Sequence, residues 1–176
     1  MQQRCYSSPV TYSGLGTQLR TMLDLMDGDV ATVLADLGEP DYRPRFTPIV
    51  RALVSLGPQP IRSLAAAVGV THSAASQTVA AMKRQDLVDL VAGTDGRERI
   101  VALTAKTRAL LPKLEAEWAA TEAAAAELDA ELPYPLSDLV AEVMTALERR
   151  SFRKRIEESA WTAAHPEFAR AIGHRS

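Results

Sequence analysis

The stretch from residue 61 to residue 104 is the part of this chain that most restricts its possible folds. Residues 61–69 have the apolar spacing of a short helix that ends at a glycine, and residues 70–85 have that of a second helix. Two apolar strands follow, over residues 87–91 and 100–103, and a charged loop joins them. This order of helix, turn, helix and two-stranded wing predicts a winged helix-turn-helix, whose second helix can enter the major groove of DNA.

The composition indicates the general class of protein. Of the 176 residues, 47% are hydrophobic and 24% are charged, which is typical of a globular protein with enough chain to bury a core. One domain, or one domain with a helical extension, is therefore expected. The single cysteine, Cys5, excludes an intramolecular disulfide, and we interpret it as a bystander thiol rather than a redox sensor. Because no apolar run is as long as a membrane span and no signal-peptide core is present, the sequence predicts a cytoplasmic protein.

Charge is distributed unevenly along the chain. The net charge of the whole chain is −2, which by itself argues against a protein that binds nucleic acid. Residues 43–108, however, contain ten Lys and Arg residues and four acidic residues, so this stretch carries +6 and the remainder carries −8. A basic middle between acidic flanks is typical of a DNA-reading module on an acidic scaffold, and we favour this interpretation over ordinary solvated charge.

Apolar stripes at helical spacing flank this module on both sides. The first stripe ends before Gly38 and Pro40, and it comprises Leu15, Leu19, Met22, Met26, Val30, Val33 and Leu37. A long helix from Thr104 to about Glu131 has a seam of Leu111, Leu114, Trp118, Thr121, Ala125, Leu128 and Leu132, and Pro112 is expected to bend it near its start. After a break at Pro133 and Pro135, a helix from Leu136 continues through residues 149–155, and residues 161–172 form a weaker tail helix.

These patterns predict a mainly α-helical fold with a small β-wing. A helix from Arg45 to Leu56 precedes the helix-turn-helix, and its apolar face comprises Phe46, Ile49, Val50, Leu53 and Val54. Residues 60–61 are expected to form a short strand. We divide the chain into a flexible N-terminus at 1–13, an N-terminal dimerisation helix at 14–42, a winged-helix DNA-binding domain at 43–106 and a C-terminal helical dimerisation region at 107–176. The apolar stripes exceed what one small winged helix can cover, so a two-fold partner is expected.

The second helix of the motif has two different faces. Thr71 is placed to cap its N-terminus, and Ala75, Val79 and Met82 are expected to face inward. The outer face carries Ser73, Ser76, Gln77, Ala80, Lys83 and Arg84. We predict that Ser73, Ser76 and Gln77 read base edges in the major groove and that Lys83 and Arg84 contact phosphates. For His72, a phosphate contact and a solvent-exposed position are equally plausible.

The chain resembles the MarR family of transcriptional regulators over roughly residues 43–115. The resemblance is carried by the apolar helix of residues 46–56, the helix-turn-helix, Leu87-Val88, and above all by the wing Asp95-Gly-Arg97 that leads to Val101-Ala-Leu-Thr104. Two positions depart from the family pattern, because the family usually has glycine where this chain has Asp86 and again where it has Thr107. Asp tolerates the left-handed turn conformation better than most residues, so the first departure is mild.

The resemblance implies an obligate homodimer on a pseudo-palindromic operator and a small effector, often an aromatic acid. On the wing, Arg97 and Arg99 are expected to reach the minor groove or its rim, with Asp95 paired to Arg97 to shape the loop. Phe46, Arg51 and Trp118 are candidates for lining an effector pocket, but core packing is the favoured role for the two aromatic residues.

Other functional classes have less support in the sequence. His72, His165 and His174 lack metal-ligand spacing, and no phosphate-binding glycine loop or catalytic set is present, so neither an enzyme nor a cofactor is expected. A winged-helix protein-interaction module is the main alternative, and the PadR family is a second. The cluster of residues 149–155 is interpreted as a carboxylate site, an extra DNA contact or a solvated face, with the last favoured.

Overall fold

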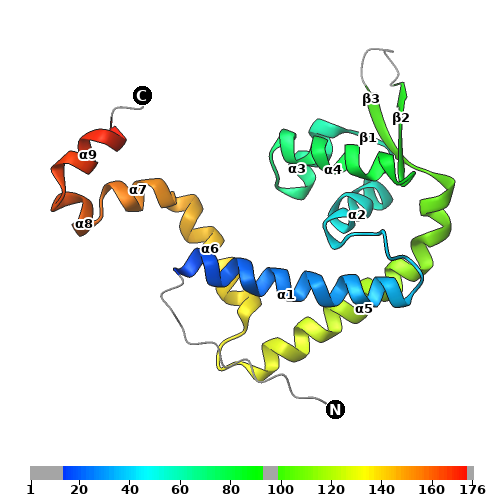
Figure 1. Cartoon of the computed structure of the whole chain (residues 1–176), viewed down its shortest axis with the longest axis horizontal. Coiled ribbons are helices and arrows are strands. Elements are labelled where there is room, and N and C mark those ends of the chain that lie inside the picture. The colour runs from blue at the N-terminus through cyan, green and yellow to red at the C-terminus, as the bar shows by residue number, and fades with distance from the viewer. Residues whose placement is uncertain (1–13, 93–98, 174–176) are drawn as a thin grey trace. The chain divides into compact units, whose positions relative to one another are not determined.

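The computed structural model describes residues 14–92 and 99–173 (Figure 1). The chain divides into two units, residues 1–121 and 122–176. The first unit contains α1 (Leu15–Asp36), the 3-10 helix η1 (Pro44–Phe46), α2 (Thr47–Leu56), β1 (Gln59–Pro60), α3 (Ile61–Val68), α4 (His72–Arg84), β2 (Val88–Ala92), β3 (Arg99–Leu103) and most of α5 (Ala105–Glu131). The second unit contains the end of α5 and then α6 (Leu136–Arg149), α7 (Phe152–Glu157), α8 (Ala160–Ala163) and α9 (Pro166–Gly173).

The three strands form an antiparallel sheet in the order β1-β3-β2. Leu90 of β2 lies opposite Val101 of β3, and Pro60 of the short edge strand lies opposite Ile100. The predicted winged helix-turn-helix is therefore confirmed, with element bounds within one or two residues of those expected from the sequence. Figure 1 shows α2, α3 and α4 gathered against this sheet.

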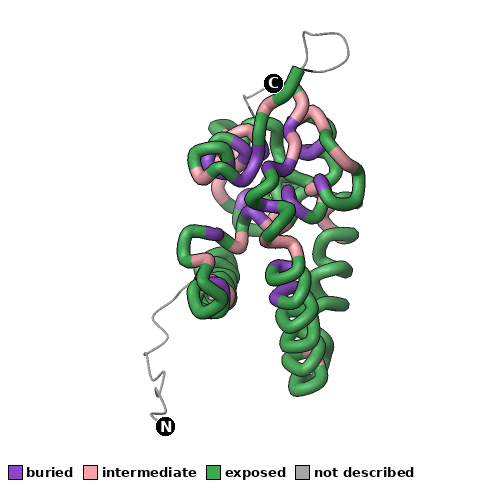
Figure 2. Tube along the Cα trace, turned by 90° about the vertical axis from the view of Figure 1, so that its right-hand side faces the viewer, coloured by how far each residue is buried: buried purple, intermediate pink, exposed green. Residues whose placement is uncertain are grey.

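The core of the first unit lies where the helix-turn-helix meets the sheet and the start of α5. Its fully buried side chains come from nearly every element of the unit and include Leu34, Phe46, Val50, Leu64, Val79, Met82, Val88, Val101 and Leu114. Figure 2 shows the buried positions concentrated in this part of the chain. Burial of large apolar side chains provides about 1.5–3 kcal/mol each, so this cluster is the main source of stability of the unit.

Two turns have the left-handed backbone that the sequence indicated. Gly69, between α3 and α4, has φ 72° and ψ 30°. Asp86, between α4 and β2, has φ 57° and is the only described non-glycine residue with a positive φ. The family pattern has glycine at the position of Asp86, and the structure shows that this turn does require a left-handed residue.

The start of α5 is not disturbed by Thr107, the second departure from the family pattern. The helix begins at Ala105, and Thr107 is fully buried at 0% exposure. Its hydroxyl donates to the carbonyl oxygen of Leu87 over 2.6 Å, so the side chain replaces the glycine with a hydrogen bond rather than with a clash. Pro112 lies inside α5 without ending the helix.

The structure corrects the expected continuation of α6 through residues 149–155. Arg150 is extended, with φ −149° and ψ 106°, and ends the helix. The side chain of Ser151 then accepts from the backbone N–H of Lys154 and starts α7. The expected tail helix is likewise two helices, α8 and α9, because α9 starts at Pro166 and proline cannot supply the N–H that an uninterrupted helix requires there.

Much of the predicted apolar surface outside the winged helix is uncovered in the single chain. In α1 only Leu34 is buried, and Leu15, Leu19, Met26, Val33 and Leu37 are between 38% and 69% exposed. α6 has no buried residue, although Val143 and Met144 are apolar. Val54 was expected on the buried face of α2 but is 44% exposed. None of the described helices is both long and apolar enough to cross a membrane.

Candidate nucleic-acid interface

The second helix of the helix-turn-helix, α4, starts with a side-chain cap. Thr71 has an extended backbone, and its Oγ1 accepts from the backbone N–H of Ala74 over 3.2 Å. This bond satisfies one of the amides that the first turn of a helix leaves without a partner, so it fixes where α4 begins. The N-cap predicted from the sequence is therefore confirmed.

The inner face of α4 is anchored in the core. Ala75, Val79 and Met82 are 1%, 2% and 0% exposed, as expected from their spacing. The opposite face carries Ser73, Gln77, Ala80, Lys83 and Arg84, which are exposed, and Ser76, which is partly exposed. The five residues predicted for base and phosphate contacts thus lie on one accessible side of a rigidly packed helix. Their contacts with DNA stay predictions.

A hollow of about 420 Å³ lies beside this outer face. Its wall on the α4 side includes Ser76, Ala80, Lys83 and Arg84, and Ile61 and Leu90 contribute from α3 and β2. The composition of the wall changes along α4, from a hydroxyl and a methyl group near the middle of the helix to two cations in its last turn. This order places positive charge at the edge of a mainly apolar surface.

The far end of α4 is tied to the first turn of α5 by side chains. The Oγ1 atom of Thr104 donates to the carbonyl oxygen of Asp86 over 2.8 Å. The hydroxyl of Thr107 donates to Leu87 O, and Lys106 Nζ donates to Gln85 O over 2.9 Å. These bonds satisfy carbonyl groups that the end of a helix and the following turn leave open. These hydrogen bonds hold the end of α4 and the turn that follows it against the start of α5.

The wing is described only at its base. Arg99 is exposed at the start of β3, opposite Ala92 of β2. Asp95 and Arg97 lie outside the described residues, so their predicted pairing and the minor-groove contact stay predictions. His72 is exposed at the first position of α4, which leaves both of its expected environments open.

The three candidates for an effector pocket do not form one open site in this structure. Phe46 is 0% exposed and belongs to the core. The guanidinium of Arg51 lies over the ring of Trp118, 4.7 Å from its centroid, and Trp118 is 8% exposed. The indole Nε1 of Trp118 is buried, and no hydrogen-bond partner for it is found in the described part of the chain. The structure thus brings Arg51 and Trp118 into contact, whereas Phe46 is buried in the core and is not open to a ligand from solvent.

The sequence analysis missed two polar residues of this region, Glu117 and Tyr42. Glu117 is 4% exposed and accepts from Thr121 Oγ1 over 2.6 Å. Burial and, to a smaller extent, the charge of Glu117 raise the pKa of Tyr42 to about 12, although a hydrogen bond with Thr47 opposes the shift. The position of Glu117 beside Trp118 in an apolar seam was the available signal, because acids seldom face a core without a partner.

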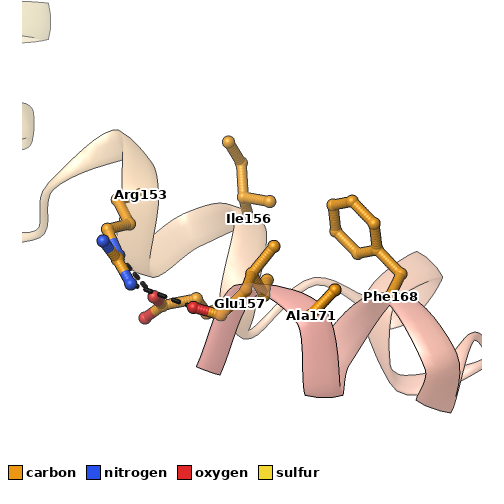
Figure 3. Close-up of a pocket in the computed structure, with 6 residues that line it drawn as sticks. Arg153, Ile156, Glu157, Phe168 and Ala171 are labelled. Carbon is orange, nitrogen blue, oxygen red and sulfur yellow. Dashed lines mark hydrogen bonds and ion pairs between the residues drawn. The ribbon is translucent and has the colours of Figure 1, made fainter. Parts of the chain in front are cut away.

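The basic cluster of residues 149–155 is largely engaged within the second unit. Arg153 Nε pairs with Glu157 over 2.7 Å, and its Nη2 donates to Ile172 O of α9 over 3.0 Å. Arg155 Nη2 donates to Ala146 O at the end of α6, and Arg150 pairs with Glu158 over 2.9 Å. Figure 3 shows Arg153 paired with Glu157 at one side of a hollow of about 480 Å³ between α7 and α9. These contacts support a structural role for the arginines over a carboxylate site.

No metal site is suggested by the described side chains. Within residues 14–92 and 99–173, no group of three or more His, Cys, Asp or Glu side chains is placed to hold a metal ion.

Comparison with solved structures identifies the fold. The MosR transcriptional regulator of Mycobacterium tuberculosis, solved in complex with DNA, is 25% identical, with a TM-score of 0.59 over 78% of this chain and 98% of that one. PcaV of Streptomyces coelicolor, solved with its natural ligand, is 15% identical, with a TM-score of 0.56 over 80% and 99% of the two chains. BpsR of Bordetella bronchiseptica, whose DNA binding is regulated by 6-hydroxynicotinic acid, is 15% identical, with a TM-score of 0.54 over 81% and 97%.

No family model and no curated protein sequence matches the chain. The similarity to the solved regulators nevertheless extends over nearly their entire length. The chain therefore has the fold of the MarR family of winged-helix transcriptional regulators, as its helix-turn-helix and wing motifs predicted.

Proposed function

We propose that the protein is a homodimeric, sequence-specific DNA-binding transcriptional regulator, and that it is a repressor whose affinity for DNA is modulated by a small-molecule effector. The observation that carries this proposal is the outer face of α4, where short polar side chains are followed by Lys83 and Arg84 on a helix whose other face is buried. Short polar groups allow close approach to base edges, and the cations then meet phosphates. No catalytic role is included in the proposal.

The charge distribution supports a DNA partner. Residues 43–108 carry +6 in a chain of net charge −2, and this stretch includes all of the winged helix. A concentrated basic region attracts the phosphate backbone and releases bound counterions, which supplies much of the affinity of such complexes. We accordingly propose that the protein acts in the cytoplasm, where it reaches DNA.

The uncovered apolar faces of α1 and α6 support the homodimer. Monomeric proteins seldom expose large contiguous apolar surface, and a two-fold partner would cover both faces. The same symmetry would present two copies of α4 to two half-sites of a pseudo-palindromic operator, about one helical turn of DNA apart. We therefore propose that residues 14–42 and 107–176 form the dimerisation region and residues 43–106 the DNA-binding domain.

The effector proposal rests on the region around Trp118. Arg51 supplies a guanidinium over the indole ring, and the buried Nε1 of Trp118 offers a donor. These groups suit a small aromatic acid. Of the solved regulators of the same fold, PcaV holds its natural ligand and BpsR is regulated by 6-hydroxynicotinic acid. Such a ligand acts by binding one arrangement of the dimer more tightly than another, and α5 connects this region to the end of α4.

The proposal is tested by measuring binding of the full chain to the DNA flanking its own gene, across a salt series and against random DNA, with the oligomeric state measured by analytical ultracentrifugation. We expect a dimer that binds one segment at least about 10³-fold more tightly than random DNA, with affinity falling steeply as salt increases. Equal binding to both DNAs, tested also with a library of random sequence, would contradict specific recognition. A dimer without DNA affinity would instead support a winged-helix protein-interaction module.

A further inference from the structure

The hollow beside α4 indicates which feature of a base pair this protein selects. Four of its seven lining residues are apolar: Ile61, Val79, Ala80 and Leu90. A surface that contacts only phosphates and hydrogen-bonding base edges has no need of such a lining. The inference that follows rests on the proposed DNA binding and adds to it the identity of one group that is read.

Ala80 occupies the middle of the exposed face of α4. It lies one turn after Ser76 and one turn before Lys83 and Arg84, so the four residues share one side of the helix. Ala80 is exposed and has no atom beyond Cβ, which permits the helix backbone to approach the floor of a groove closely. Its methyl group is the one apolar contact that this central position can offer.

The major groove presents only one apolar group, the 5-methyl group of thymine. That methyl projects from the base edge into the groove, and alanine is among the side chains that contact it. We propose that Ala80, with the hollow formed by Ile61 and Leu90, receives a thymine methyl group, so that the protein selects a T·A pair at the centre of each half-site.

The charges at the edge of the hollow favour DNA over an apolar or acidic peptide as the occupant. Lys83 and Arg84 line the hollow at the C-terminal end of α4, where their positive charges complement the phosphates on either side of a bound base. An amphipathic peptide helix would need large apolar anchors on the exposed face of α4, but the exposed positions Ser73 and Gln77 are polar.

The test begins with selection of bound sequences from random double-stranded DNA by the full-length protein. Each thymine of the selected operator is then replaced in turn by deoxyuridine, which removes only the 5-methyl group. We expect one thymine position in each half-site to lose about fourfold in affinity, the factor that burial of one methyl group contributes. Replacement at the other thymines is expected to change affinity by less than about twofold.

Two variants assign the effect to Ala80. Ala80→Gly removes the receiving methyl group, and Ala80→Ser replaces it by a polar group with a smaller loss of helix propensity. Both are expected to bind the thymine and deoxyuridine operators equally well. Ala67→Gly is the matched control, because Ala67 is an exposed alanine of α3 that lies outside the hollow, and the variant should retain the fourfold preference.

The outcomes distinguish this inference from the proposed function. An operator that no deoxyuridine replacement weakens would overturn the methyl contact while leaving sequence-specific binding intact. A thymine preference that persists in both Ala80 variants would show that the methyl group is read elsewhere and would also overturn the inference. If selection enriches no sequence, specific DNA binding itself is refuted, and the thymine contact with it.

Discussion

The hydroxyl of Thr107 donates to the carbonyl oxygen of Leu87 over 2.6 Å and so joins the first turn of α5 to the residue after the α4–β2 turn. That turn contains Asp86, whose own carbonyl oxygen accepts from Thr104. Asp86 and Thr107 are the two positions where the sequence departs from the family's glycines, and the structure places them on the two sides of one contact. The bond to Leu87 gives the buried hydroxyl of Thr107 a partner, and Asp86 adopts the left-handed backbone for which glycine is otherwise favoured.

Thr107→Val should destabilise the protein by about 1–3 kcal/mol, because it leaves the buried carbonyl oxygen of Leu87 with a weaker set of donors and keeps the shape of the side chain. Chemical denaturation at fixed protein concentration measures the change. Thr145→Val is the matched control, since Thr145 is an exposed helical threonine that donates to Ala141 O over 3.0 Å. Equal losses in the two variants would contradict a special role for Thr107.

Asp86→Val is expected to cost about 1–2 kcal/mol, since a β-branched residue is strained at the observed φ of 57°. Asp86→Asn should stay within about 0.5 kcal/mol of the parent, because Asn tolerates the left-handed region well. Asp89→Val, at an exposed position of β2, controls for loss of the charge. Thermal unfolding distinguishes them, and a loss for Asp89→Val as large as that for Asp86→Val would refute the backbone explanation.

Replacing both Lys83 and Arg84 by Ala should lower the slope of log affinity against log salt by about 2, one unit for each lost phosphate contact. Fluorescence anisotropy with labelled operator DNA over a salt series measures this slope. Arg149→Ala with Arg170→Ala removes two positive charges from α6 and α9 and should leave the slope unchanged. A reduced slope in this control would assign DNA contacts to the second unit.

Arg97→Ala combined with Arg99→Ala should weaken operator binding strongly while the dimer stays intact, because the wing cations are expected to contact the minor groove or its rim. Titration with operator DNA and ultracentrifugation measure the two properties. Unchanged affinity would remove the wing from the mechanism.

Stability should fall as pH rises from about 10 to about 12 because of Tyr42. The pKa of Tyr42 is raised from 10.0 to about 12 in the folded protein, so the unfolded chain releases its proton first. This contribution is complete below pH 10 and is lost as pH approaches 12. Tyr42→Phe should remove that part of the pH dependence in denaturation experiments, whereas Tyr134→Phe, at a residue that is 72% exposed, is the control. A pH dependence that Tyr42→Phe leaves unchanged would contradict this assignment.

Replacing Val140 and Val143 by Asp should dissociate the dimer, because both side chains are about half exposed on the uncovered face of α6. Light scattering after size-exclusion chromatography measures the mass of the species. Thr145→Asp places a charge on the opposite side of α6 and should leave the dimer intact. A parent protein that is monomeric at micromolar concentration would refute the dimer directly.

The winged helix was predictable because its signals are local. The spacing of Ala75, Val79 and Met82 gives the buried face of α4, and Thr71 and Gly69 mark where the two helices meet. The left-handed turn at Asp86 followed from the position that the family fills with glycine. In each of these cases the residue and the structural requirement lie within a few positions of one another.

The features that sequence analysis missed depend on contacts between distant residues. The break between α6 and α7 is stabilised by Arg155, whose guanidinium donates to Ala146 O and Arg150 O, and no periodicity shows such a bond. The buried side chains of Thr107 and Glu117 likewise have hydrogen-bond partners that spacing does not reveal. Thr107 donates to Leu87 O, and Glu117 accepts from Thr121 one turn further along α5. The same reason explains the basic cluster of residues 149–155, whose Arg150 and Arg153 form ion pairs with Glu158 and Glu157.

The edge strand β1 also affects how the protein behaves in a crowded solution. An open sheet edge is a template on which a strand of another molecule can grow, and repeated growth leads to aggregation. β1 is only two residues long, and its second residue, Pro60, has no N–H to offer to an incoming strand. On the other edge, β2 carries the exposed charge of Asp89. The sheet that supports the wing thus resists edge-to-edge association even when many copies are present together.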